Sequence, residues 1–466
     1  MVTMTKNIQI RKLVVGLCSC MLITLVTIPG SLLAAEDKKD GAEKPTPPPP
    51  PPFIKAPIST TKYTKNCKPM GLQKAPKDQK RRTFALDPGN FRRMEKASEF
   101  MGEEQYDEAI VILKELAVRA ENRPYDLAKA KEYMGYAYLS KGNYDVAIKN
   151  FRDVIDQRIL PVRNEQSLIR NVAGLYLAID PPEVDKAMSI ISDWFKTAVK
   201  PKPSDYILLG QAAVLGKKYV ESICPVRMAI NISDRPKNSW FDILVAAHFE
   251  LEDFEGAAAI AEERLLSFPG EGKYWRQLSG LKSKLEKMNE ALILLELAHK
   301  QGHLKKGSEY RNLASMYSIN ELTYKAARIL QEGLDKGIIE STEKHWKQAA
   351  VNWQISRESN RAVKAYSKAG SFAEHGINEL RIGTILSEKE DWKEAVKYFR
   401  KALSKGGLKK SEEGRTHMSL GIALHNAGKS SDAIKALKKA QGFKSVKRNA
   451  SQWINYVRDA MKYASN

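Results

Sequence analysis

Residues 133–151 read YMGYAYLSKGNYDVAIKNF, and this stretch decides the fold. Its small residues Gly135 and Ala147 stand twelve positions apart, on either side of the turn-forming pair Gly142-Asn143. Phe151 follows Ala147 by one helical turn, so its ring can fill the space between two paired helices. The stretch therefore predicts a helix, a short turn and a second helix that packs closely on the first.

The small residue at the position of Ala147 returns every 33 to 40 residues along the chain. The column consists of Ala109, Ala147, Ala187, Ser222, Ala257, Ala291, Ala326, Ala362, Ala395 and Ala433. A second small residue precedes most of these by twelve positions, as Ala97, Gly135, Gly210, Ser279, Ala314, Ala350, Gly383 and Gly421 do. A period near 34 is typical of helix-turn-helix solenoids. The sequence therefore predicts an all-α superhelical solenoid.

Aromatic and apolar residues accompany the small ones in a constant order. One unit carries Gly383, Leu386, Trp392, Ala395, Phe399 and Ala402. Such units resemble the tetratricopeptide repeat, whose pattern of Trp, Leu, Gly, Tyr, Ala, Phe and Ala they follow. The resemblance implies about ten helix-turn-helix units over residues 91–443, followed by a capping helix within 444–466.

The middle of the array departs from the pattern. Asp180-Pro181-Pro182 lengthens one turn by two residues, and Pro225 falls inside an expected second helix. Proline lacks a backbone N–H and its ring clashes with the preceding turn, so we expect a kink or an interruption at Pro225.

The first 35 residues have the features of a secretory signal peptide. Three basic residues precede or begin the apolar run from Leu13 to Ile28, and Pro29-Gly30 and small residues follow it before Glu36. We expect cleavage after Ala34 or Ala35, which would place the protein in the periplasm. An uncleaved inner-membrane anchor is the alternative, because the run is nearly long enough to span a bilayer.

Residues 36–90 lack helical periodicity. They contain the proline run 47–52 and then a basic stretch, and such a composition cannot bury enough apolar surface to fold alone. We therefore expect one poorly ordered extension. Beyond the signal peptide the chain keeps only Cys67 and Cys224. An oxidising compartment permits a disulfide between them, and two unpaired thiols are the alternative.

The composition limits the classes of function. The mean hydropathy of −0.43 excludes a polytopic membrane protein, and the net charge of +21 falls to +18 without the three basic residues of 1–35. An exported protein does not meet nucleic acid in ordinary function, so the excess charge suits an acidic protein segment, anionic lipid headgroups or cell-wall groups.

No catalytic motif is present. The sequence contains no phosphate loop, nucleophile elbow, zinc-protease helix or CxxC pair. His299 and His303 are four residues apart, but Gly302 between them predicts an exposed turn rather than a metal site. We therefore expect no enzyme, no cofactor and no metal.

A protein-binding groove is the stronger expectation. Stacked helix pairs form a concave surface lined mainly by the first helix of each unit. The groove-facing positions hold Arg170, Asn171, Lys273, Arg276, Arg311, Lys344, Lys347, Gln348 and Arg381. This basic set suits an acidic segment or a C-terminal carboxylate.

Two observations argue against a specific carboxylate clamp of the family. Ser315 and Ile377 stand where such a clamp would have Asn and Lys. A generally basic groove is therefore the expectation. The alternative is that these cations are solvated or pair with acidic neighbours such as Glu309 and Glu379.

The chain also resembles a narrower family, the tetratricopeptide-repeat proteins of TonB-type energy-transduction systems. The resemblance rests on the signal peptide, the extension and the runs Tyr310–Ala314 and Tyr324–Ala327. It implies a periplasmic scaffold that contacts inner- or outer-membrane transport proteins. The alternative function is envelope assembly or polysaccharide export, with docking to an outer-membrane channel or to the cell wall.

Overall fold

The computed structural model describes residues 55–74, 81 and 84–464. The predicted signal peptide and the proline run 47–52 lie outside the described residues. The chain divides into two compact units, residues 1–269 and 270–466, and each is described by itself.

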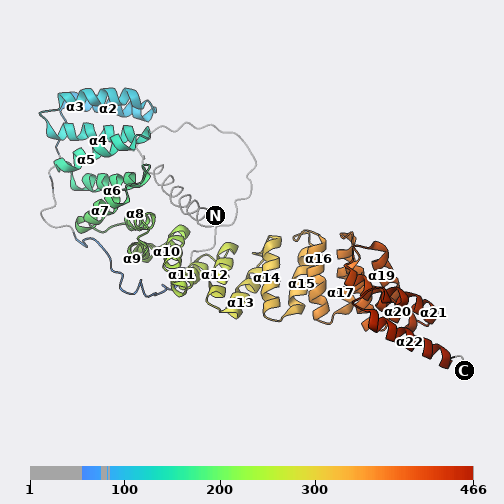
Figure 1. Cartoon of the computed structure of the whole chain (residues 1–466). Helices are drawn as coiled ribbons and strands as arrows, with labels where there is room; N and C mark the ends of the chain where they lie inside the picture. The colour runs from blue at the N-terminus through green and yellow to red at the C-terminus, as the bar shows by residue number, and fades with distance from the viewer. Residues whose placement is uncertain (1–54, 75–80, 82–83, 465–466) are drawn as a thin grey trace, which may run out of the picture. The chain divides into compact units, whose positions relative to one another are not determined.

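Every regular element described in the first unit is a helix (Figure 1). The helices are α2 (Pro88–Gly102), α3 (Tyr106–Arg119), α4 (Pro124–Ser140), α5 (Tyr144–Gln157), α6 (Val162–Ala178), α7 (Val184–Thr197), α8 (Pro203–Leu215), α9 (Tyr219–Ile232), α10 (Asn238–Glu250) and α11 (Phe254–Ser267).

The described part of the second unit is also helical. Its helices are α12 (Gly272–Lys284), α13 (Met288–Lys300), α14 (Gly307–Ile319), α15 (Thr323–Asp335), α16 (Glu343–Ile355), α17 (Ser359–Ser371), α18 (Ile377–Glu388), α19 (Trp392–Lys405), α20 (Lys410–Asn426), α21 (Ser430–Gln441) and α22 (Lys447–Ala464).

The helices form consecutive antiparallel pairs, from α2–α3 to α20–α21. The even-numbered member of each pair is called the first helix below, and the odd-numbered member the second helix. These ten pairs confirm the predicted all-α class of stacked helix-turn-helix units. Among the described helices, none combines the length and apolar character needed to cross a membrane.

The small residues of the repeat allow the two helices of a pair to touch. Gly135 lies against the ring of Phe151, and a Cβ added at Gly383 would lie 2.7 Å from Cδ1 of Phe399. Ala147 and Phe399 are fully buried. The sequence pattern therefore predicted the helix–helix contact correctly.

The irregular middle of the array is more continuous than the sequence suggested. The turn around Pro181 is long, running from the end of α6 at Ala178 to Val184, as expected. Helix α9, however, continues through Pro225 to Ile232 without interruption.

The last helix covers the end of the second unit. Val446 and Ala450 pack with Ala440 of α21 in one buried cluster, and Ile454 and Val457 are also buried. The apolar face of α22 thus covers the final pair, which would otherwise expose its core.

Part of the predicted extension is folded. Residues 55–74, called the strap below, pack on the first unit, with Ala56, Thr61 and Thr64 buried. The prediction of one poorly ordered extension over 36–90 is wrong for this segment, because its backbone polar groups find partners on the repeats. The first helix also begins earlier than expected, at Pro88, where Asp87 accepts a hydrogen bond from the backbone N–H of Gly89 at 2.9 Å.

Enlarging a contact glycine should separate a helix pair. We expect Gly383→Val to destabilise the second unit by about 1–3 kcal/mol, since the new side chain would overlap Phe399. Gly280→Val is the matched control, because Gly280 lies in helix α12 with open space around its Cβ position. Thermal unfolding followed by circular dichroism compares the two. Equal stability of both variants would contradict the close contact.

Candidate protein-binding surfaces

Five of the predicted groove residues gather on the first helices of the second unit. Arg311 lies on α14, Lys344, Lys347 and Gln348 on α16, and Arg381 on α18. These five residues are called the first-helix surface below. The three from α16 line a shallow depression together with Val351, Asn352 and His375.

The cations of the first-helix surface have no acidic partner. Within the described residues, the side chains of Arg311, Lys344, Lys347 and Arg381 form no ion pair and no hydrogen bond. The neighbouring carboxylate of Glu343 is already engaged: it accepts a hydrogen bond from Asn378 at 3.0 Å and lies 3.4 Å from His375 Nε2. The surface therefore presents uncompensated positive charge.

Two other predicted cations are used inside the repeats. Arg170 pairs with the buried carboxylate of Asp205 at 2.9 Å, and Arg276 pairs with Glu309 at 3.0 Å. Each pair joins one first helix to the next. Asp205 also accepts a hydrogen bond from the backbone N–H of Lys202 at 2.7 Å. Each of these two arginines joins neighbouring helix pairs within one unit, so the prediction of free groove cations is wrong for them.

The remaining two predicted residues also have local partners. Asn171 hydrogen-bonds to Tyr136, and burial, with the nearby carboxylate of Glu132, raises the pKa of Tyr136 to about 12. Lys273 is exposed, and its ammonium lies 4.8 Å from the centre of the Tyr274 ring. Neither belongs to the first-helix surface.

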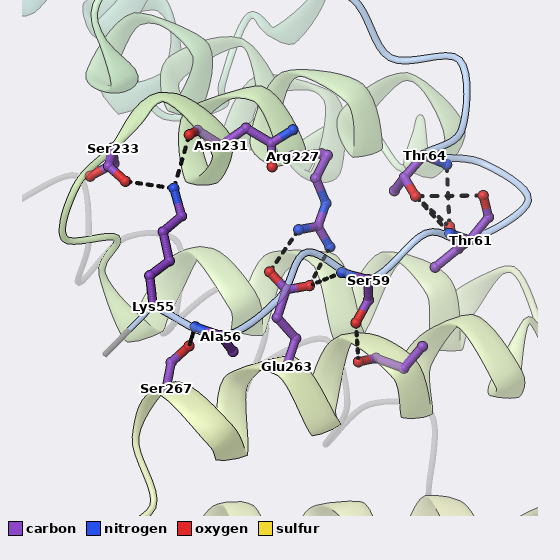
Figure 2. Close-up of polar contacts among 11 residues, drawn as sticks. Lys55, Ala56, Ser59, Thr61, Thr64, Arg227, Asn231, Ser233, Glu263 and Ser267 are labelled. Carbon is purple, nitrogen blue, oxygen red and sulfur yellow. Dashed lines mark hydrogen bonds and ion pairs between the residues drawn. The ribbon is translucent and has the colours of Figure 1, made fainter. Parts of the chain in front are cut away.

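The strap lies in a groove of the first unit that the sequence did not predict. The groove is formed by the second helices α9 and α11 with the first helix α10 between them, and it is called the second-helix groove below. Figure 2 shows Lys55, Ala56 and Ser59 following one another along the strap, between residues of α9 and α11. The strap therefore lies on a surface made mainly by second helices, whereas the sequence predicted a binding groove made by first helices.

The groove forms hydrogen bonds with the backbone of the strap and with the side chains of Lys55 and Ser59. Lys55 donates to the carbonyl groups of Asn231 and Ser233, each at 2.9 Å. The backbone N–H of Ala56 donates to Ser267 at 3.2 Å, and Ser59 Oγ donates to the Ala259 carbonyl at 3.0 Å (Figure 2). These are contacts that an extended peptide can make.

A buried ion pair lies beneath the strap. Arg227 of α9 and Glu263 of α11 form two hydrogen bonds at 2.8 and 3.0 Å, and their side chains are only 1% and 2% exposed. Glu263 also accepts the backbone N–H of Ser59 at 2.9 Å (Figure 2). The carboxylate thus connects both second helices to the strap.

His248 of α10 forms the floor of the groove. Its Nε2 lies 3.4 Å from Thr61 Oγ1 of the strap, and its Nδ1 lies 2.8 Å from Asp253. Burial lowers the pKa of His248 below its usual range, although Asp253 acts in the opposite direction. Nearby Arg227 and Lys62 lower it further. The neutral imidazole is therefore the form that suits the occupied groove.

The far end of the strap is fastened covalently and by backbone pairing. Cys67 and Cys224 are joined by a disulfide, with their Cα atoms 5.1 Å apart. Met70 exchanges two hydrogen bonds with the hydroxyl of Tyr206, at 3.0 and 2.8 Å. Leu72 forms a parallel bridge with Val199 in the loop after α7. The sequence suggested the disulfide but not the groove to which it connects the strap.

His299 and His303 lie four residues apart in the sequence but do not act together in the structure. In the part of the chain that the structure describes, no group of three His, Cys, Asp or Glu side chains could hold a metal ion. His299 lies 3.3 Å from Glu332, and the ring of His303 stacks on Trp275 at 6.1 Å between ring centres. The two histidines therefore have separate structural partners.

Removing one member of the buried ion pair should be costly. We expect Glu263→Ala to destabilise the first unit by about 3–5 kcal/mol, since it leaves the charge of Arg227 buried and unpaired. The double variant Arg227→Met, Glu263→Met should recover most of this loss. Thermal unfolding of both variants is the measurement. A double variant less stable than Glu263→Ala would show that the unpaired charge of Arg227 does not cause the loss of stability.

Acid should loosen the strap. Because folding lowers the pKa of His248, its contribution to stability is fully present above the unfolded pKa of about 6.5 and is lost as the pH falls below that value. We expect hydrogen exchange of the Thr61–Thr64 backbone, relative to intrinsic rates, to rise between about pH 7.5 and pH 5.5. The His248→Gln variant should show a smaller rise. An equal rise in both proteins would exclude His248 as the cause.

Comparison with known proteins supports the repeat assignment. Residues 380–447 match the family model of the tetratricopeptide repeat. The search of the curated proteins found no match.

Several solved structures resemble the chain at low identity. The Cut9–Hcn1 hetero-tetramer of the APC/C is 14% identical with a TM-score of 0.26, and the match covers 80% of this chain and 78% of that one. The C-terminal part of a TPR repeat-containing protein from Cytophaga hutchinsonii is 12% identical with a TM-score of 0.34, covering 52% and 97%. YrrB, described as a TPR protein with an unusual peptide-binding site, is 13% identical with a TM-score of 0.32, covering 42% and 97%.

The family match covers residues 380–447, and the ten helix pairs have the helix-turn-helix arrangement of such repeats.

Proposed function

We propose that the chain is an exported, non-enzymatic scaffold that binds acidic segments of protein partners through the first-helix surface. The observation that carries the proposal is the set of four cations, Arg311, Lys344, Lys347 and Arg381, that have neither ion-pair nor hydrogen-bond partners among the described residues. They lie on three successive first helices of one unit.

Their chemistry suits carboxylates. The guanidinium groups of Arg311 and Arg381 offer two parallel donors to one carboxylate, and Lys344 and Lys347 supply mobile point charges beside them. Gln348 adds a neutral donor and acceptor. The depression on this surface is lined mainly by charged and polar side chains, which suits an acidic segment.

The proposed setting is the periplasm. The signal-like sequence of residues 1–35 supports export, and the disulfide between Cys67 and Cys224 suits an oxidising compartment. The resemblance to repeat proteins of TonB-type systems supports a role in an energy-transduction or transport complex. The partners would be acidic segments of inner- or outer-membrane transport proteins.

An envelope-assembly or polysaccharide-export role is the second candidate. The net charge of +18 after residue 35 would also suit acidic cell-wall groups. Crosslinked complexes from the native envelope separate the two settings: transport proteins support the first, and glycan-synthesis or cell-wall components support the second.

Reversing the charge of the first-helix surface should abolish partner binding. We expect the triple variant Arg311→Glu, Lys347→Glu, Arg381→Glu to recover at least about tenfold less partner after crosslinking, because attraction is replaced by repulsion. Quantitative mass spectrometry of the recovered proteins is the measurement.

A matched triple variant controls for net charge. Lys393→Glu, Lys438→Glu and Lys444→Glu change three exposed lysines of the same unit that lie off the first-helix surface and form no ion pair among the described residues. We expect this variant to recover partner normally. If both triple variants recovered the same amount of partner, the first-helix surface would not be the binding site.

A further inference from the structure

The second unit contains a counterpart of the groove that holds the strap. Adding 105 to the residue numbers of α10 (Asn238–Glu250) gives α16 (Glu343–Ile355), and the same shift places the start of α11, Phe254, on the start of α17, Ser359. A shift of 104 places Tyr219 of α9 on Thr323 of α15. Helices α15, α16 and α17 therefore form the second-helix groove of the second unit.

The residues that hold the strap have direct counterparts in this groove. On α9 and α10, Cys224 corresponds to Arg328, and His248 to Trp353. On α11, Ala259 corresponds to Lys364, and Glu263 to Lys368. All four counterparts line a hollow of about 730 Å³ between α15 and α17. The hollow thus lies where the strap lies in the first unit.

The floor of the hollow is aromatic. Trp353 and Trp346 of α16 line it and are almost fully buried. The guanidinium of Arg361 lies 4.7 Å from the centre of the Trp353 ring and donates a hydrogen bond to Tyr324 at 3.1 Å. This aromatic floor lies between two second helices, at the position that His248 occupies in the first unit.

The charge of the groove differs from that of its counterpart. In the first unit the carboxylate of Glu263 that accepts the strap backbone is paired with Arg227, whereas the second unit presents Arg328, Lys364 and Lys368, which have no ion pair or hydrogen bond among the described side chains. Two acidic residues, Glu332 and Asp335, also line the hollow, and both have partners at the C-terminal end of α15. Glu332 pairs with Lys336 at 2.7 Å, and Asp335 accepts a hydrogen bond from Gln331 at 2.9 Å.

The charge also excludes the strap of a second copy as the occupant. Residues 55–74 carry five lysines and no acidic side chain. Such a segment would place like charges against Lys364 and Lys368, which is unfavourable. The occupant that fits the groove has the extended backbone of the strap and the opposite charge.

We propose that the second-helix groove between α15 and α17 binds an extended acidic peptide of a protein partner. The peptide lies along the groove as the strap does in the first unit, with acidic side chains facing Lys364, Lys368 and Arg328 and small or apolar side chains over Trp353. This site is separate from the first-helix surface and does not depend on it.

A synthetic peptide tests the site directly. The probe has the sequence of residues 55–67 with Gln in place of Lys55, Lys62 and Lys65, and with Glu in place of Ser59 and Cys67. Ser59 contacts the counterparts of Lys364 and Lys368, and Cys67 the counterpart of Arg328, so both glutamates would meet cations. The control peptide carries Gln at these two positions. Fluorescence anisotropy with the full-length chain measures both affinities.

We expect the acidic probe to bind at least about tenfold tighter than the neutral peptide. The variant Lys364→Glu, Lys368→Glu should lose at least about tenfold in affinity for the probe. The variant Lys393→Glu, Lys438→Glu, with the same net charge, should bind the probe within about twofold of the unchanged chain. Circular dichroism confirms that both variants are folded, since all four lysines are exposed.

Other outcomes would overturn the proposal. Equal binding of the acidic and neutral peptides would show that the cations do not recognise the probe. Equal affinities of the two lysine variants would show that binding does not use this groove. Loss of binding only in the variant Arg311→Glu, Lys347→Glu, Arg381→Glu would assign the peptide to the first-helix surface, which would support the proposed function and overturn this inference.

Discussion

The close contact between the two helices of each pair is the constraint on which the rest of the structure depends. Glycine or alanine on the first helix lets a ring or branched side chain of the second helix approach, as Phe399 approaches Gly383. Because this contact repeats, equivalent residues of α10–α11 and α16–α17 are separated by a constant 105 positions. The core side chains are therefore used for packing, and binding is left to positions that the repeat does not fix.

Those remaining positions form two kinds of surface, one on the first helices and one on the second helices. The surfaces differ in which of their residues already have partners within the chain. On the first helices, Arg170 and Arg276 join neighbouring helix pairs through Asp205 and Glu309. The cations of the first-helix surface, on α14, α16 and α18, have no ion pair among the described residues. On the second helices, the first unit binds the strap through Glu263, and the second unit presents lysines at the corresponding place. A scaffold of this kind can bind one extended segment within its own chain and leave a related groove for another.

Much of the fold could be predicted from sequence, since the spacing of Ala147, Ala395 and their equivalents follows directly from helix geometry. The ion pairs could be predicted only in part. Glu309 was an expected alternative partner, but Asp205 was not, because a charge pattern alone does not show which cations are paired. The strap was missed for a physical reason. Its groove satisfies an extended backbone through Ser267, Glu263 and Tyr206, and such contacts leave no periodic signal in the strap itself.

The disulfide was the one clue to that arrangement, since pairing Cys67 with Cys224 requires the segment before the repeats to reach α9. The constant offset of 105 residues between α10–α11 and α16–α17 is a second clue, because it identifies equivalent positions in the two units. Glu263 and Lys368 occupy equivalent positions 105 residues apart, and the strap shows what a side chain at this position contacts.

The central claim is that partners are bound by the unpaired cations of the second unit. Lysine-directed crosslinking of the full-length chain in its native envelope, followed by mass spectrometry of the crosslinked peptides, tests it most directly. The account predicts partner crosslinks at Lys344, Lys347, Lys364 and Lys368. Partner crosslinks confined to the strap lysines or to α19–α22 would contradict it.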